Sequence, residues 1–160
     1  MRSFMKRLIF LLTATTLLLS SVCLLTAEPV KPGPKDRCPV CGMFVAPYAA
    51  WTAQIAFNDG SRVFFDGPKD MFKFFLKLPL EGKNHSRKTI AGIYVTEYYS
   101  TKPAAADSLL YVVGSDVLGP MGKELVPVAG KETARTFVRD HGGRTILTFD
   151  QVTEKILTGL

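Results

Sequence analysis

The sequence contains few residues of the kinds that build zinc centres or catalytic sites. Its 160 residues include only two histidines, three cysteines and one tryptophan. A structural zinc site uses four thiolate or imidazole ligands, and too few of these lie near one another here. The chain also has no phosphate-binding loop, no HExxH helix and no nucleophile elbow. The sequence therefore favours a protein that is not an enzyme.

The N-terminal segment, residues 1–27, contains no acidic residue. Three basic residues precede an apolar run over residues 8–19, and the segment ends at the small residue Ala27. This order of features predicts an export signal that is cleaved or lipid-modified. A retained membrane anchor is the alternative, because residues 8–27 are about long enough to span a bilayer.

Cys23 occupies the place where a bacterial lipoprotein carries its lipidated cysteine. A lipoprotein signal prefers an aliphatic residue three positions earlier and a small residue directly before the cysteine. Here Ser20 and Val22 stand at those two positions. The match is poor, so we favour a cysteine within the signal itself, with lipidation at Cys23 as the alternative.

The basic character of the chain belongs partly to this segment. Removal of residues 1–27 takes away Arg2, Lys6 and Arg7 and lowers the formal net charge from +6 to +3. A small charge spread over scattered lysines and arginines does not indicate a nucleic-acid partner. Residues 28–37 (EPVKPGPKDR) are rich in proline and charge, which predicts a flexible linker.

Three sulfur-bearing residues lie directly after this linker, in the sequence Cys38-Pro39-Val40-Cys41-Gly42-Met43. Thiolates and thioethers are soft ligands, and soft ligands select Cu(I) over hard cations. In an extended segment Cys41 and Met43 point to the same side, roughly 6.6 Å apart. We therefore predict a Cu(I) site with Cys41 and Met43 as ligands and Cys38 as a contributor.

Other interpretations of the same residues stay open. Cys38 and Cys41 span a four-residue turn, which also permits a disulfide or a redox pair. Pro39 favours such a turn, and Lys35 and Arg37 would lower a thiol pKa in a redox site and a metal site alike. A structural zinc site is the least favoured alternative. Met43 alone would be interpreted as a core residue that fills a gap.

Two residues in the second half are further candidates for the metal site. Met121 is flanked by the turn formers Gly119, Pro120 and Gly122, which makes it a poor core residue and a candidate third sulfur ligand. His141 precedes two glycines at a predicted helix end, where capping explains it and metal binding is the alternative. Met71 repeats at helical spacing with aromatic residues, so we expect it in the core.

The periodicity of the chain predicts the same order of elements twice. Alternating apolar residues predict strands, and Asp66 and Pro68 are expected to cap and begin the first helix. The predicted elements of the first unit (38–100) are strands 51–57 and 61–65, a helix to 77, and strand 89–98. After a second linker at 102–107, the second unit (107–160) has strands 109–113 and 124–128 joined by a loop at 114–122, helix 131–140 and strand 144–149. A short helix ends the chain. The prediction is an α+β fold.

In these residues the chain resembles the NosL family, copper-binding accessory proteins associated with maturation of nitrous oxide reductase. The features that carry the resemblance occur in matching order: Cys41-Gly42-Met43, strand 51–57 with Asp59-Gly60, Phe64-Phe65-Asp66, and segments 112–115, 119–127 and 141–143. Together they span nearly all of residues 38–160. The Cys-x-Met motif common in the family corresponds to Cys41 and Met43.

The resemblance implies two related ββαβ units that form one NosL-like region, similar to the N-terminal part of organomercurial lyase. It also implies one Cu(I) per chain, carried outside the cytoplasmic membrane by proteins that are commonly lipoproteins. The implied receiver is a periplasmic cuproenzyme such as nitrous oxide reductase, or an ABC-type maturation complex. We expect a monomer that is exported to the periplasm, with a membrane tether as an option.

Overall fold

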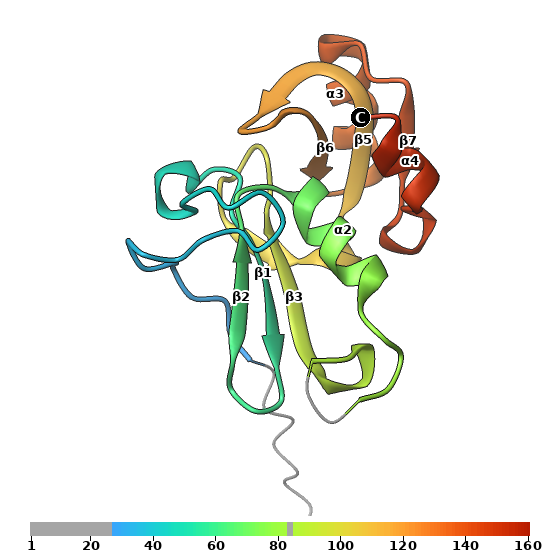
Figure 1. The fold of residues 1–160 in the computed structure, drawn as a ribbon. Coiled ribbons are helices and arrows are strands. Elements are labelled where there is room, and N and C mark those ends of the chain that lie inside the picture. Colours follow the sequence, from blue (N-terminus) through green and yellow to red (C-terminus); the bar gives the residue numbers. More distant parts are fainter. Residues whose placement is uncertain (1–26, 83–84) are drawn as a thin grey trace, which may run out of the picture.

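The computed structural model describes residues 27–82 and 85–160, which form two antiparallel sheets with helices packed against them (Figure 1). The elements of the first half are η1 Ala46–Tyr48, β1 Ala53–Phe57, β2 Arg62–Phe65, α2 Pro68–Lys77, η2 Arg87–Thr89, β3 Ile90–Thr96 and β4 Pro103–Ala105. The elements of the second half are η3 Ala106–Ser108, β5 Leu110–Gly119, β6 Gly122–Val128, α3 Lys131–His141, β7 Thr145–Leu147, η4 Phe149–Gln151 and α4 Glu154–Thr158.

The two halves share one strand arrangement. The first sheet has the order β2-β1-β3-β4, and the second has the order β6-β5-β7. In each sheet the first strand of the unit lies between its hairpin partner and the strand that follows the helix, and all pairs are antiparallel. The predicted α+β class, with the ββαβ order occurring twice, is confirmed.

Two segments differ from the sequence-based expectation. The predicted linker at 102–107 contains β4, which pairs with β3 at the edge of the first sheet, a place where Pro103 is tolerated. The predicted loop at 114–122 is mostly strand. A register irregularity between Val113 and Leu118 lets β5 continue to Gly119, so only Pro120 and Met121 remain in the turn.

Helix α2 begins as predicted at Pro68, but Asp66 does not cap it. The N-cap residue is Gly67, and no side chain bonds the free N–H groups of the first turn as a cap. Proline suits the first position of a helix because its missing N–H has no partner there. The carboxylate of Asp66 is therefore available for other contacts. Met71 is fully buried, as expected for a core residue.

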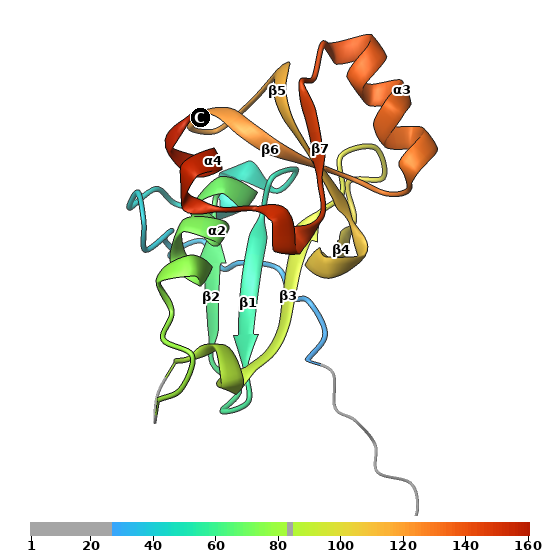
Figure 2. The same cartoon turned by 90° about the vertical axis from the view of Figure 1, so that its right-hand side faces the viewer.

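Helix α2 lies at the junction of the two halves. It contacts β1 and β2 of the first sheet, β6 of the second sheet, and the C-terminal helix α4, which lies beside it in Figure 2. One hydrophobic core runs through both halves and includes Ile55, Phe72, Tyr111 and Leu125. Helix α3 covers β5 of the second sheet and ends at Gly142 in a left-handed conformation, which confirms the predicted stop.

The N-terminal part of the described chain contacts the first sheet. The backbone N–H of Val30 donates to Oε1 of Gln54 at 3.1 Å, and Nε2 of Gln54 donates to the Val30 carbonyl at 2.9 Å. The predicted export signal and Cys23 lie outside the described residues. Among residues 27–82 and 85–160, no helix is both long and apolar enough to cross a membrane.

Candidate metal centre

The loop that carries the sulfur residues is closed by its own backbone. The N–H of Cys38 donates to the carbonyl of Met43, and the N–H of Gly42 donates to the carbonyl of Cys38, both at 2.8 Å. Gly42 has φ +80°, a conformation that glycine adopts without strain. Arg37 and Phe44 form an isolated antiparallel bridge at the base of the loop. The loop is therefore a defined turn rather than an extended strand.

Both cysteines are free thiols in partly dry surroundings. Cys38 is buried and Cys41 is half-buried. Burial raises the pKa of the Cys38 thiol, although backbone hydrogen bonds from Cys41 and Val40 act in the opposite direction. Burial also raises the pKa of Cys41, against a backbone hydrogen bond from Met43. Both sulfur atoms therefore keep their protons at neutral pH unless a cation displaces them.

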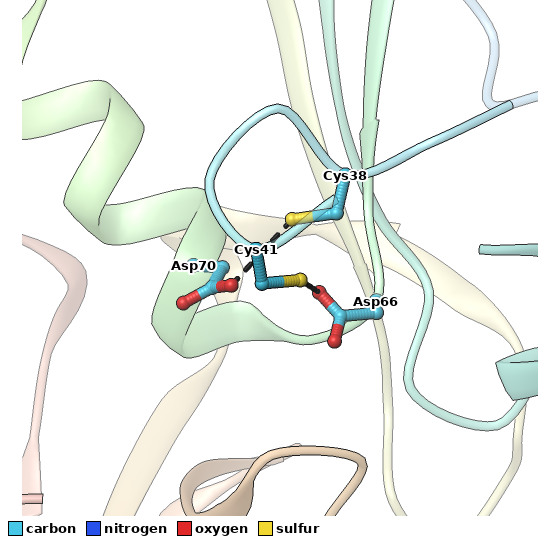
Figure 3. Close-up of side chains that lie close together, drawn as sticks. All are labelled: Cys38, Cys41, Asp66 and Asp70. Carbon is cyan, nitrogen blue, oxygen red and sulfur yellow. Dashed lines mark hydrogen bonds between the residues drawn. The ribbon is translucent and has the colours of Figure 1, made fainter. Parts of the chain in front are cut away.

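Two aspartates face these thiols (Figure 3). The Cys41 thiol donates to Oδ1 of Asp66 at 3.3 Å, and the Cys38 thiol donates to Oδ2 of Asp70 at 3.5 Å. One ligand atom from each of the four residues lies within 4.8 Å of the others. The arrangement brings two sulfur and two oxygen atoms to one point, which is the number of ligands in a tetrahedral metal site.

The carboxylates come from the junction of β2 and α2. Asp66 directly follows the last residue of β2, and Asp70 lies in the first turn of α2, where the positive end of the helix dipole favours an anion. Both are buried, with exposed fractions of 1% and 3%. Nζ of Lys73 pairs with Oδ1 of Asp70 at 3.1 Å. Oδ2 of Asp66 is buried and has no hydrogen-bond partner among the described residues.

Met43 and Met121 reach this region by different routes. Met43 is half-buried and follows Cys41 by two residues in the closed loop. Met121 is 48% exposed in the turn between β5 and β6. Nζ of Lys69 donates to the Met121 carbonyl at 3.2 Å, and Lys69 directly precedes Asp70 in α2. The turn that carries Met121 is therefore fastened to the helix turn that carries Asp70.

A buried carboxylate strengthens this attachment. Oε1 of Glu124, in β6, accepts the backbone N–H of Lys69 at 2.6 Å and that of Leu125 at 2.9 Å. Burial raises the pKa of Glu124 to about 7, although the backbone hydrogen bonds from Leu125 and Lys69 act against it. The contact joins the N-terminus of α2 to the second sheet.

Both histidines have other partners. Nδ1 of His141 lies 3.1 Å from Oδ1 of Asp116, and its ring centroid lies 4.5 Å from that of Phe137 on α3. His85 stacks on Phe57 at 3.8 Å, and its Nε2 lies 2.8 Å from Oγ of Ser61. Neither histidine belongs to the cluster of four ligands found in the part of the chain that the structure describes.

The sequence analysis missed both aspartates. It assigned Asp66 to a helix cap and gave Asp70 no role. Asp66 and Asp70 are four residues apart at a strand-to-helix junction, and this spacing is the one local signal that pointed to them. Their meeting with Cys38 and Cys41 depends on the fold of the loop over this junction, which no local pattern specifies.

Comparison with known proteins identifies the family. A sequence model of the NosL family matches residues 29–157. The copper-binding lipoprotein NosL of Stutzerimonas stutzeri is 28% identical over 138 residues, which cover 81% of this chain and 68% of the relative. The crystal structure of the copper chaperone NosL from Shewanella denitrificans is 20% identical with a TM-score of 0.66, covering 80% of this chain and 97% of that one, so the two share a fold. The solution structure of apo-NosL from Achromobacter cycloclastes gives 26% identity and a TM-score of 0.45, over 66% of this chain and 87% of the other. Because the family match spans residues 29–157 of the 160, this chain belongs to the NosL family.

Proposed function

We propose that this chain is an exported Cu(I)-binding metallochaperone. The observation that carries the proposal is the closeness of the two free thiols of Cys38 and Cys41 on one closed loop. Cu(I) is a soft monovalent ion, and thiolates are among the ligands that bind it best. The names of two relatives, a copper-binding lipoprotein and a copper chaperone, support copper as the cargo.

In the proposed site Cys38 and Cys41 bind Cu(I) as thiolates, and Met43 and Met121 add neutral thioethers. One thiolate balances the single charge of the ion, and a thioether adds a soft ligand without further charge. The hydrogen bond from the Cys38 N–H to the Met43 carbonyl supports Met43, because it holds the two backbones together. The bond from Lys69 to the Met121 carbonyl supports Met121.

The exposure of the loop suits a carrier that must release its metal. Cys41 is half-buried, and its neighbour Val40 is 41% exposed. A partner protein with sulfur or histidine ligands thus has access to one side of the site and takes the ion by ligand exchange. We propose a periplasmic cuproenzyme, such as nitrous oxide reductase, or its ABC-type maturation complex as the receiver.

The proposed domain organisation follows the sequence. Residues 1–27 direct export and are then removed, kept as an anchor or lipid-modified, residues 28–37 connect them to the fold, and residues 38–160 carry copper. A relative described as a lipoprotein supports a membrane attachment.

A thiol–disulfide exchange protein is the alternative function for the Cys38-Cys41 pair. Such a protein needs a reactive thiolate, and the pKa of a redox cysteine is usually lowered. Burial raises the pKa of both thiols here. This direction favours the metal-binding function, because a bound cation displaces the protons directly.

An anaerobic Cu(I) titration of the reduced chain in mild detergent tests the proposal. A competing chromophoric chelator reports affinity and stoichiometry. We expect one tightly bound Cu(I) per chain, and a lower affinity in Met43→Leu and in Cys38→Ser. Weak binding that is the same in wild type and Met43→Leu would contradict the copper site and favour the redox pair.

Delivery requires a separate test. The copper-loaded chain is mixed with copper-free nitrous oxide reductase, and copper is followed in the two separated proteins. Transfer faster than from the same concentration of Cu(I)–chelator complex supports delivery. Equal rates would show that the chain stores copper without passing it to this enzyme.

A further inference from the structure

The same cluster has a second capacity that its sulfur atoms alone do not explain. We infer that Cys38, Cys41, Asp66 and Asp70 together form a site for a borderline divalent cation of the Zn²⁺ type. Cu(I) would use the sulfur ligands and leave the carboxylates free, whereas a divalent ion would use all four residues. This inference shares the two cysteines with the proposed copper site but does not require that the chain deliver copper.

The distances already approach those of a tetrahedral site. Zn²⁺ binds thiolate sulfur at about 2.3 Å and carboxylate oxygen at about 2.0–2.2 Å, which places ligand atoms roughly 3.3 to 3.8 Å from one another. The measured separations are 3.3 Å between Cys41 Sγ and Asp66 Oδ1, and 3.5 Å between Cys38 Sγ and Asp70 Oδ2. All four atoms lie within 4.8 Å of each other, so small side-chain rotations close the set.

An unsatisfied buried oxygen points to a ligand at this place. Asp66 is only 1% exposed, and its Oδ2 has no hydrogen-bond partner among residues 27–82 and 85–160. Its other oxygen is directed at the Cys41 thiol. A buried carboxylate oxygen without a partner is costly, and a bound cation removes that cost by binding the carboxylate.

The charge of the full set favours a divalent ion. Two thiolates and two carboxylates carry four negative charges, and Lys73 offsets one of them through its pair with Asp70. Charge repulsion is strong in a buried site because the local dielectric constant is low. A divalent ion offsets twice as much of the remaining charge as Cu(I) does.

Ligand chemistry separates the two metals. Carboxylate oxygen is a hard ligand that suits divalent ions and adds little to a Cu(I) site, whereas a thioether suits Cu(I) and adds little to a Zn²⁺ site. Substitution of the aspartates should therefore affect Zn²⁺ and spare Cu(I). Substitution of Met43 should do the reverse.

The experiment measures both metals on the full chain, reduced and held in mild detergent without oxygen. Zn²⁺ affinity is measured by competition with a chromophoric chelator, and Cu(I) affinity in parallel. Asp66→Asn and Asp70→Asn preserve the size of each side chain, and Asp59→Asn, at an exposed turn residue, is the matched control. Thermal unfolding identifies any variant that fails to fold.

We expect one Zn²⁺ per wild-type chain, an affinity at least about tenfold lower in Asp66→Asn and Asp70→Asn, and no change in Asp59→Asn. Cu(I) affinity should stay within about threefold in both aspartate variants. Wild-type Zn²⁺ affinity no higher than that of the aspartate variants would overturn the inference. Because Asp66 is buried, its variant might not fold; Asp70→Asn and the spectrum described next then decide the question.

Co²⁺ supplies an independent measurement on the unmodified chain. A tetrahedral thiolate-bound Co²⁺ has intense visible absorption bands that a six-coordinate ion on surface carboxylates lacks. We expect these bands in wild type and their loss in Cys41→Ser. Their absence from wild type would overturn the site. Loss of Cu(I) binding with Zn²⁺ binding intact would contradict the proposed copper function alone, and the opposite result would contradict this inference alone.

Discussion

The sulfur atom of Cys41 lies 3.3 Å from Oδ1 of Asp66, a residue 25 positions further along the chain. This contact joins the sulfur-bearing loop to the end of β2, directly before α2 begins. Because α2 also contacts β6, the loop is attached to a helix on which both sheets rest. A change at the metal loop is thus transmitted to the junction of the two ββαβ units.

The first prediction concerns Cys41 itself. Replacement by serine removes a soft thiolate and leaves a hydroxyl of similar size at a half-buried position. We expect Cu(I) affinity to fall by orders of magnitude while thermal unfolding and far-UV circular dichroism stay close to wild type. Chelator competition measures the affinity. Unchanged affinity would remove Cys41 from the site.

The second prediction concerns Met121, whose exposed side chain makes it suitable for substitution. We expect Met121→Leu to lower Cu(I) affinity by about tenfold without a change in stability, because leucine keeps the apolar volume and removes the thioether. Leu118→Ala, at a 63% exposed residue of the same hairpin, is the matched control and should leave Cu(I) affinity unchanged. Equal effects of the two substitutions would show that Met121 acts by surface contact rather than as a ligand.

Much of the fold was predictable because its signals are local. The alternation of β1, the turn at Asp59-Gly60 and the stop at Gly142 each depend on a few neighbouring residues. Strand β4 has no such signal. Its sequence Pro103-Ala104-Ala105 does not alternate, and it forms a strand because β3 offers an unpaired edge.

The length of β5 was underestimated for a related reason. Gly114 has φ +81° and suggested a loop, but the strand absorbs this conformation in the irregular register between Val113 and Leu118. The sulfur half of the candidate site was visible because its residues are consecutive. The carboxylate half was not, because Asp66 and Asp70 meet the cysteines only through tertiary packing.

The third prediction concerns the close approach of Gly67 to Glu124. A Cβ atom at position 67 would lie 2.4 Å from Oε2 of Glu124, which is buried and fixed by its hydrogen bonds. We expect Gly67→Ala to destabilise the fold by roughly 1–3 kcal/mol. Gly82→Ala, where the nearest side-chain atom would lie 3.6 Å away, is the control and should change stability little. Equal denaturant midpoints for the two variants would contradict this packing.

The fourth prediction concerns the pH dependence of stability through Glu124. Burial raises its pKa in the folded chain to about 7, above its ordinary value of 4.5. Between these two values the folded chain binds more protons than the unfolded chain, so the free energy of unfolding falls as the pH rises. We expect this residue to make the chain more stable at about pH 5 than at about pH 8, by roughly 2–3 kcal/mol.

Urea unfolding of wild type and Glu124→Gln across this range measures the effect. Glutamine keeps an oxygen that accepts the Lys69 and Leu125 N–H groups but does not titrate, so the variant should lose most of the pH slope. Glu132→Gln is the control, because the Glu132 side chain is 85% exposed and its charge form costs little to solvate in either state. If the Glu124→Gln variant kept the wild-type slope, the buried carboxyl would be ionised throughout, stabilised by its two backbone hydrogen bonds and by Lys69 more strongly than burial disfavours it.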